Sequence, residues 1–143
     1  MFDSFIGGPC TGADPSMPAG PACDLSGKTL PDAPLWTVTA SSDYFVEMGS
    51  LLGFVHGEVY YRGERNVQGA LTDLTIQDAT TMVNASIGIR AGDGESWEVF
   101  LWSRNLTDEE YVQTVFDSVA QSGSLSGYPN VPRTYGITGR ILF

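Results

Sequence analysis

The chain has 143 residues, of which 17 are acidic and 7 basic, and a formal net charge of −10. A length of this order suits a single domain, and so acidic a surface is a poor partner for nucleic acid, because neutralising phosphates needs clusters of Lys and Arg. No run of about 18 apolar residues is present, which excludes a transmembrane helix, and the N-terminus lacks the basic and long apolar regions of a signal peptide.

The N-terminal quarter is dominated by a long loop. Residues 1–6 are compatible with the end of a strand, and residues 7–34 hold six of the eight prolines. Cys10 and Cys23 enclose a segment rich in Pro, Gly and Ala. They could be a free buried pair, but a disulfide fits better, because neither lies in an apolar pattern and the loop between them has no core of its own. A disulfide predicts an oxidising compartment.

Five segments then alternate with a period of two, which predicts strands with different surroundings on their two faces. The expected strands cover about 35–47, 51–64, 79–91, 96–106 and 133–143. Residues 48–50 and the sequence Gly92-Asp-Gly94 predict short turns, whereas residues 65–78 and 107–132 form longer loops. Thr107 followed by Glu110 predicts one or two helical turns in the last loop.

This order predicts an all-β fold: an antiparallel up-and-down meander of about five or six strands. In such a meander, the short turns lie at one end and the long loops at the other. Inside the strands, beyond their first residues, the charged side chains all fall on one parity, and the opposite parity has none. This charged set comprises Asp43, Glu47, His56, Glu58, Arg62, Arg90, Glu98, Arg104 and Arg140.

This pattern favours lipid over a protein core as the surroundings of the side chains on the uncharged parity. Strands of about ten residues that alternate apolar-out and polar-in, with short turns at one end and long loops at the other, are typical of transmembrane barrels. Aromatic residues near the strand ends suit the two interfaces of a membrane; they are Trp36, Tyr44, Tyr61, Trp97, Tyr135 and Phe143. The alternatives are a small secreted β-sandwich that binds a ligand and another outer-membrane barrel, such as a porin or an adhesin.

Three segments together resemble the C-terminal end of TonB-dependent outer-membrane receptors. They are Asp24-Leu-Ser-Gly-Lys-Thr-Leu-Pro-Asp-Ala-Pro-Leu-Trp36, Arg104-Asn-Leu-Thr-Asp-Glu-Glu-Tyr111 and Pro132-Arg-Thr-Tyr-Gly-Ile-Thr-Gly-Arg-Ile-Leu-Phe143. Each alone is weak, but in this order and spacing they cover nearly the whole chain. Cys10 and Cys23 also resemble loop cysteines that precede the first of these segments in many members.

The resemblance implies that residues 1–143 are the C-terminal portion of a 22-stranded transmembrane barrel in the outer membrane of a Gram-negative cell. Such a receptor imports a scarce nutrient, most commonly an iron–siderophore complex. The chain contains no plug domain, TonB box or signal sequence, and five or six strands cannot close a barrel of that diameter. We therefore expect a fragment whose partners are outer-membrane lipid, the missing plug and strands, TonB through that plug, and the outer-membrane assembly machinery. The edge of the last strand would pair with a first strand outside this chain.

The resemblance also suggests roles for individual residues. The residues expected to face the lumen are Glu58, Arg62, Arg90, Glu98, Arg104 and Arg140, although they could also pair only with neighbouring strands. The loops at 7–34, 65–78 and 107–132 would be extracellular, with Trp36, Tyr111, Phe116 and Tyr128 as candidate substrate contacts. Tyr135 and Phe143 belong to the C-terminal signal that the assembly machinery reads in this family.

We expect no enzymatic activity, metal or cofactor. A single His and the absence of a Ser or acid motif beside it leave no nucleophile–base pair. His56 has no second ligand at metal-binding spacing. The adjacent carboxylates of Asp108, Glu109 and Glu110 are typical of a solvated helix start rather than of a glycosidase pair.

Overall fold

The computed structural model describes residues 1, 3–18, 20–92 and 96–141. The fold is all-β, with 53% of residues in strands. Within the described part of the chain there is no α-helix, and a single 3₁₀ turn, η1, covers Asp73–Thr75. The chain divides into two compact units. We call Thr37–Tyr61, Thr81–Glu109 and Val131–Phe143 the sheet unit, and Met1–Trp36, Arg62–Thr80 and Glu110–Asn130 the loop unit.

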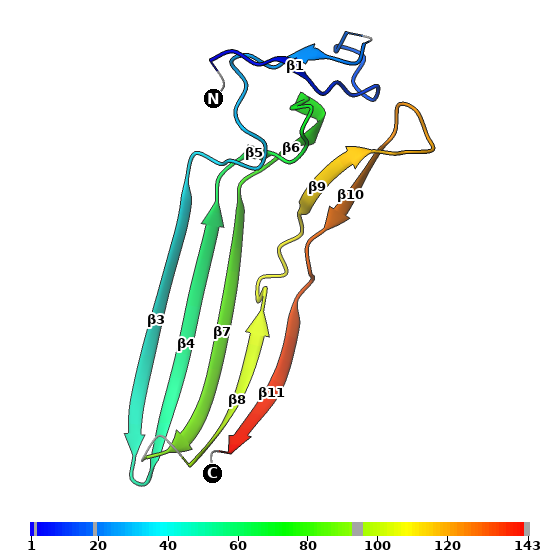
Figure 1. Ribbon diagram of the computed structural model, residues 1–143. Helices are drawn as coiled ribbons and strands as arrows, with labels where there is room; N and C mark the ends of the chain where they lie inside the picture. The colour runs from blue at the N-terminus through cyan, green and yellow to red at the C-terminus, as the bar shows by residue number, and fades with distance from the viewer. Residues whose placement is uncertain (2, 19, 93–95, 142–143) are drawn as a thin grey trace. The chain divides into compact units, whose positions relative to one another are not determined.

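The sheet unit is built from five long strands that lie side by side in the order β3-β4-β7-β8-β11 (Figure 1). Their bounds are β3 (Thr37–Met48), β4 (Leu51–Arg62), β7 (Thr80–Ala91), β8 (Trp97–Arg104) and β11 (Thr134–Ile141). Each strand pairs with the next long strand along the chain, and the sheet is antiparallel. The predicted antiparallel meander is therefore confirmed for these five strands.

The strand boundaries follow local chemistry. Gly49 and Ser50 link β3 to β4, and Gly49 has φ of 68°, a left-handed conformation that glycine adopts without steric cost. The Gly92 N–H donates to the Ser50 carbonyl over 2.8 Å, which joins the end of β7 to the turn between β3 and β4. The predicted turn at Gly92-Asp-Gly94 lies partly outside the described residues, and Phe143 lies wholly outside them.

The segments expected to be loops contain three small two-stranded sheets. β1 (Ile6–Gly8) pairs with β2 (Cys23–Asp24), β5 (Arg65–Asn66) with β6 (Ile76–Gln77), and β9 (Val112–Asp117) with β10 (Leu125–Pro129). All three pairs are antiparallel. These sheets give backbone groups of the long connections hydrogen-bond partners that an irregular loop would leave to water.

The predicted helical turns after Thr107 are wrong. Asn105 and Asp108 adopt left-handed backbone conformations, with φ of 51° and 57°, which an α-helix of L-residues does not accommodate. The Asn105 side chain, not that of Thr107, organises the bend: its Oδ1 accepts from the Glu109 N–H at 2.8 Å. The chain then enters β9 at Val112.

The buried apolar residues are concentrated in the loop unit. Cys23, Leu25 and Leu71 form a cluster against which Phe5, Cys10 and Met17 pack. Among the described residues, Ala91 is the only buried apolar residue of the sheet unit. The five-stranded sheet therefore has no second layer within its own unit, and both of its faces are left for other surroundings.

Candidate functional site

The register of the strands gathers the charged side chains on one side of the sheet. Residues directly opposite in an antiparallel pair point to the same side. Arg90 is opposite Glu98, which is in turn opposite Arg140. We call this side, which also holds Ser86 and Trp102, the polar face.

Side-chain contacts extend the polar face across β4 and β3. His56 Nδ1 lies 2.8 Å from a carboxylate oxygen of Asp43. Glu58 accepts a hydrogen bond of 3.0 Å from the side-chain amide of Asn84. The guanidinium of Arg90 lies over the ring of Phe45, 5.3 Å from its centroid. Each contact joins residues of different strands, so this face holds a connected polar and aromatic layer.

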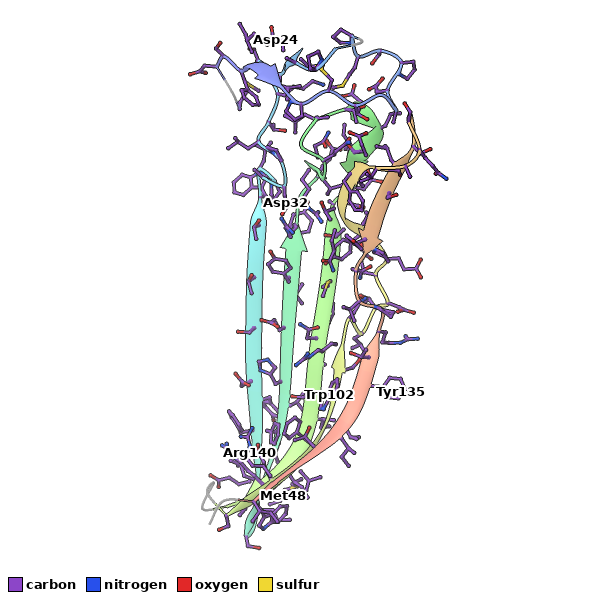
Figure 2. All side chains as sticks on the ribbon, turned by 45° about the vertical axis from the view of Figure 1, so that its right-hand side comes forward. Asp24, Asp32, Met48, Trp102, Tyr135 and Arg140 are labelled. Atoms are coloured by element: carbon purple, nitrogen blue, oxygen red, sulfur yellow. A yellow bond between two sulfur atoms is a disulfide. The ribbon has the colours of Figure 1, made fainter. Side chains whose placement is uncertain are left out.

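The end of the sheet formed by β8 and β11 has its own set of partners. Arg140 and Glu98 form an ion pair of 2.9 Å. Trp102 donates its indole N–H to Thr138 over 3.0 Å, and the guanidinium of Arg104 lies 5.5 Å from a Trp102 ring centroid. Figure 2 shows the labelled Trp102 and Arg140. The half-buried indole ring lies beside Gly136, where a Cβ would be only 2.7 Å from the ring.

A shallow hollow lies on the polar face between these groups. Its lining includes the side chains of His56, Glu58, Asn84, Trp102 and Arg140. The arrangement offers hydrogen-bond donors, acceptors and one aromatic surface, which suits water or a polar neighbour. Within the described part of the chain, no three His, Cys, Asp or Glu side chains are grouped so as to hold a metal ion.

The opposite side of the sheet, which we call the apolar face, carries no charge on the described strands. Ala85, Ile87 and Ile89 of β7 lie opposite Ser103, Leu101 and Val99 of β8. Large apolar side chains on this face are exposed, Ile87 to 57% and Ile137 to 70%. Tyr135 belongs to the same face and is 80% exposed; Figure 2 shows its side chain projecting from β11. The other exposed large side chains of this face are Val38, Tyr44, Val46, Met48, Val55, Val59, Tyr61, Ile89, Val99, Leu101 and Ile141.

Comparisons of the chain with protein-family models, with curated proteins and with solved structures gave no match. Among the described residues, no helix has the length and apolar character required to cross a membrane.

Five of the six residues predicted to face a lumen lie on the polar face, and Arg62 is bound in the loop unit. Arg62 ends β4, and its guanidinium reaches the Asp32 carboxylate at 2.9 Å and the Asp32 carbonyl at 3.2 Å. The same carboxylate oxygen accepts from Nε of Arg65 at 3.0 Å. Asp32 therefore holds the segment before β3 against two arginines of a distant part of the sequence.

The contact between Asp32 and Arg65 was not predicted from the sequence, because nothing in the local pattern links residues 33 positions apart. The Arg65 side chain is fully buried and its guanidinium lies 5.5 Å from the centroid of the Tyr111 ring. Its two terminal nitrogens have no hydrogen-bond acceptor among the described residues. The ring of Tyr111, one of the predicted substrate contacts, packs on this buried arginine.

The other predicted loop contacts occupy different places. Phe116 and Tyr128 stack across the β9–β10 hairpin, with ring centroids 5.4 Å apart. Tyr128 is 63% exposed and Phe116 38%, so the pair presents an aromatic surface. Trp36 is 72% exposed, and its backbone carbonyl accepts a hydrogen bond of 2.9 Å from the Gly63 N–H.

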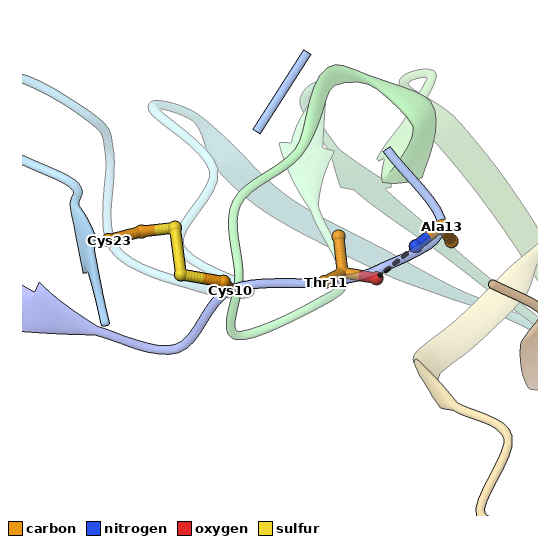
Figure 3. Close-up of a disulfide and its surroundings, with 4 residues drawn as sticks. All are labelled: Cys10, Thr11, Ala13 and Cys23. Atoms are coloured by element: carbon orange, nitrogen blue, oxygen red, sulfur yellow. Dashed lines mark hydrogen bonds between the residues drawn. A yellow bond between two sulfur atoms is a disulfide. The ribbon is translucent and has the colours of Figure 1, made fainter. Parts of the chain in front are cut away.

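A disulfide joins Cys10 to Cys23, with the two Cα atoms 5.4 Å apart (Figure 3). Beside it, the Thr11 hydroxyl accepts from the Ala13 N–H at 3.2 Å and donates to Asp117 of β9. Cys23 is buried against Leu25 and Leu71. The disulfide closes a loop within the first segment of the loop unit. The packing of Cys23 on Leu71 joins this segment to the second, and the Thr11–Asp117 bond joins it to the third.

Two carboxylates of the loop unit are stabilised in their charged form. Hydrogen bonds from Ser16, chiefly from its side chain, and from the Thr72 hydroxyl lower the pKa of Asp14 from its usual value of 3.8, with a smaller contribution from Lys28. Hydrogen bonds from Ser26 likewise lower the pKa of Asp24. Both groups are acceptors that organise turns, since each takes a bond from a residue two positions further on.

Proposed function

We propose that this chain forms part of the transmembrane barrel wall of a TonB-dependent outer-membrane receptor that imports a scarce nutrient, an iron–siderophore complex being the substrate class proposed. The single observation that carries the proposal is the sheet with one uncharged, exposed apolar face and all of its charges on the other. The resemblance of three sequence segments to the C-terminal end of that family supports the same assignment.

The energetics favour a lipid cover for the apolar face. Burying an exposed Val, Leu or Ile side chain is worth about 1.5–3 kcal/mol. Ten such residues are exposed on the apolar face, from Val38 in β3 to Ile141 in β11. A lipid bilayer would cover all ten side chains at once. The small apolar cluster of the loop unit includes none of them.

The arrangement of aromatic and polar residues is consistent with the same surroundings. Tyr44, Tyr61, Trp97 and Tyr135 lie on the apolar parity near strand ends, where their rings can meet the interfaces of a bilayer. The polar face would line the water-filled or plug-filled interior, and its ion pairs and Asn contacts would brace the wall there. In this proposal the loop unit is extracellular, and Phe116 with Tyr128 is the aromatic surface offered to substrate.

Site-specific fluorescence in a lipid bilayer tests the proposal. Both native cysteines are in the disulfide, so Ile87→Cys and Ser86→Cys each add one thiol, on the apolar and polar faces of the same strand. After labelling with an environment-sensitive dye in phospholipid vesicles, we expect blue-shifted emission and quenching by brominated lipid at position 87 only. The matched label at position 86 should respond to an aqueous quencher instead.

Two other outcomes would overturn the proposal. A chain that is monomeric in water without detergent, with its label at position 87 protected by protein, would fit the secreted β-sandwich. Equal lipid quenching at positions 86 and 87 would show that the sheet lies in lipid without an aqueous side, which no barrel wall does.

A further inference from the structure

β3 lies at one edge of the five-stranded sheet. β3 is twelve residues long, every one of them is exposed, and its hydrogen-bonded neighbour is β4 on one side. Alternate residues of an edge strand direct their N–H and C=O groups away from the sheet. Such an edge is a template on which another extended segment can add main-chain hydrogen bonds.

The side chains of β3 restrict what can pair there. Val38, Tyr44 and Val46 lie on the apolar face, while Asp43 lies on the polar face with its partner His56. A segment that continues the sheet must therefore alternate in the same way, with apolar side chains on one parity and polar ones on the other. An antiparallel orientation matches the rest of the sheet.

The charges of β3 restrict the partner further. Glu47 has the parity of Asp43, and it takes part in no ion pair among the described residues. Elsewhere on the polar face, Glu98 has Arg140 on the neighbouring strand. β3 itself carries two acidic residues and no basic one. Opposite charges on paired strands stabilise the pairing, and like charges weaken it.

We propose that the free edge of β3 binds an antiparallel β-strand that carries Lys or Arg on the polar face, opposite Glu47 and Asp43. The proposal rests on the proposed function only in that the apolar side of the added strand is expected in lipid or detergent. It specifies the partner by its chemistry: apolar residues on one parity and at least one basic residue on the other.

The test uses the whole chain in detergent micelles and two synthetic twelve-residue peptides. Both alternate Val and Thr and carry one terminal Cys; one has Arg and the other Glu at the two positions facing Glu47 and Asp43. Thr39→Cys supplies a thiol on β3, and Ser86→Cys on β7 is the control, since a central strand has no free edge. We expect a disulfide cross-link at position 39 and not at 86, with the Arg peptide favoured over the Glu peptide roughly two- to tenfold.

Charge reversal decides whether Glu47 sets this preference. Glu47→Lys should reduce or invert the preference for the Arg peptide without abolishing cross-linking. Equal yields of the two peptides, an unchanged preference in the Glu47→Lys variant, or cross-linking at 86 as efficient as at 39 would each overturn the inference. So would a Thr39→Cys homodimer that forms in place of the peptide adduct.

The outcome is separable from that of the proposed function. Lipid contact at position 87 without peptide binding at β3 would leave the barrel-wall proposal standing and remove this inference. Arg-selective peptide binding by a chain that is soluble in water would leave this inference standing and remove the barrel-wall proposal.

Discussion

Asn105 shows how one buried polar residue can determine the path of a connection. Its backbone N–H donates to Asn84 at 3.0 Å, and its side-chain amide donates to the carbonyls of Glu109 and Val131 at 2.9 and 3.3 Å. Asn105 is only 2% exposed, so water cannot readily replace it as the hydrogen-bond partner of these groups. The residue thus connects β7, the bend after β8 and the residues that lead into β11.

We therefore predict that Asn105→Ala destabilises the protein. Leaving buried partners without a hydrogen bond costs about 1–3 kcal/mol, and alanine at φ of 51° adds strain. Thr107→Ala is the control, because the helix that Thr107 would cap does not form. Denaturant unfolding in micelles should show the loss for Asn105→Ala alone; a larger loss for Thr107→Ala would contradict the assignment.

Asp14 and Asp24 predict a pH dependence of the loop unit. Hydrogen bonds hold their folded pKa values below the usual 3.8, so the unfolded chain binds more protons in that range. Their stabilising contribution is present above pH 3.8 and is lost as the pH falls through the lower folded values. Thermal unfolding followed by circular dichroism between pH 6 and pH 2.5 should show a smaller acid-induced decrease for Asp14→Asn with Asp24→Asn. Asp78→Asn, which removes a carboxylate elsewhere in the loop unit, should keep the full decrease.

Among the elements, β7 and β8 approach each other closely at Gly88. A Cβ on Gly88 would lie 2.5 Å from the Val99 carbonyl oxygen, so the backbone of β8 would have to move. Gly139 on β11 has no atom within 4 Å of the corresponding position. The two glycines therefore differ in packing although both lie inside strands.

Gly88→Ala should destabilise the sheet by about 1–3 kcal/mol, as overpacking commonly does. Gly139→Ala should be neutral or slightly stabilising, because it reduces the freedom of the unfolded chain. Heat-induced loss of the β-sheet signal in micelles measures both. Equal destabilisation would mean that strand glycines act here through conformational freedom and not through the close approach of β8.

The strands of the sheet unit could be predicted because their signal is local. Apolar residues occupy every second position in these strands, and the repeat also predicts that Ile87, Leu101 and Ile137 share one face. The loop unit could not be predicted in the same way. Its β9–β10 hairpin follows a left-handed bend at Asn105 that sequence spacing does not reveal, and the Asp32–Arg65 contact joins residues 33 positions apart.

At the scale of the whole molecule, the separation of the two faces should decide whether the chain enters a bilayer. Arg on the lipid side of a barrel costs about 2–4 kcal/mol at the membrane midplane, and much less on the inner side. We predict that Ile87→Arg sharply lowers the yield of folded protein in vesicles, whereas Ser86→Arg leaves it nearly unchanged. Protease protection and the shift of the folded band on unheated gels measure the yield. Equal losses for the two variants would contradict an inner and an outer face.

The sheet contains five strands, and five is odd. Because neighbours alternate in direction, β3 and β11 run the same way, so the two edges cannot be joined to each other in an antiparallel ring. Copies arranged head to tail would meet through a parallel seam. Closure with antiparallel pairs throughout needs an odd number of additional strands, and the 22 strands of the proposed receptor satisfy this condition, since 22 minus 5 leaves 17. Counting strands in any natural partner thus provides an arithmetic check on what can complete this wall.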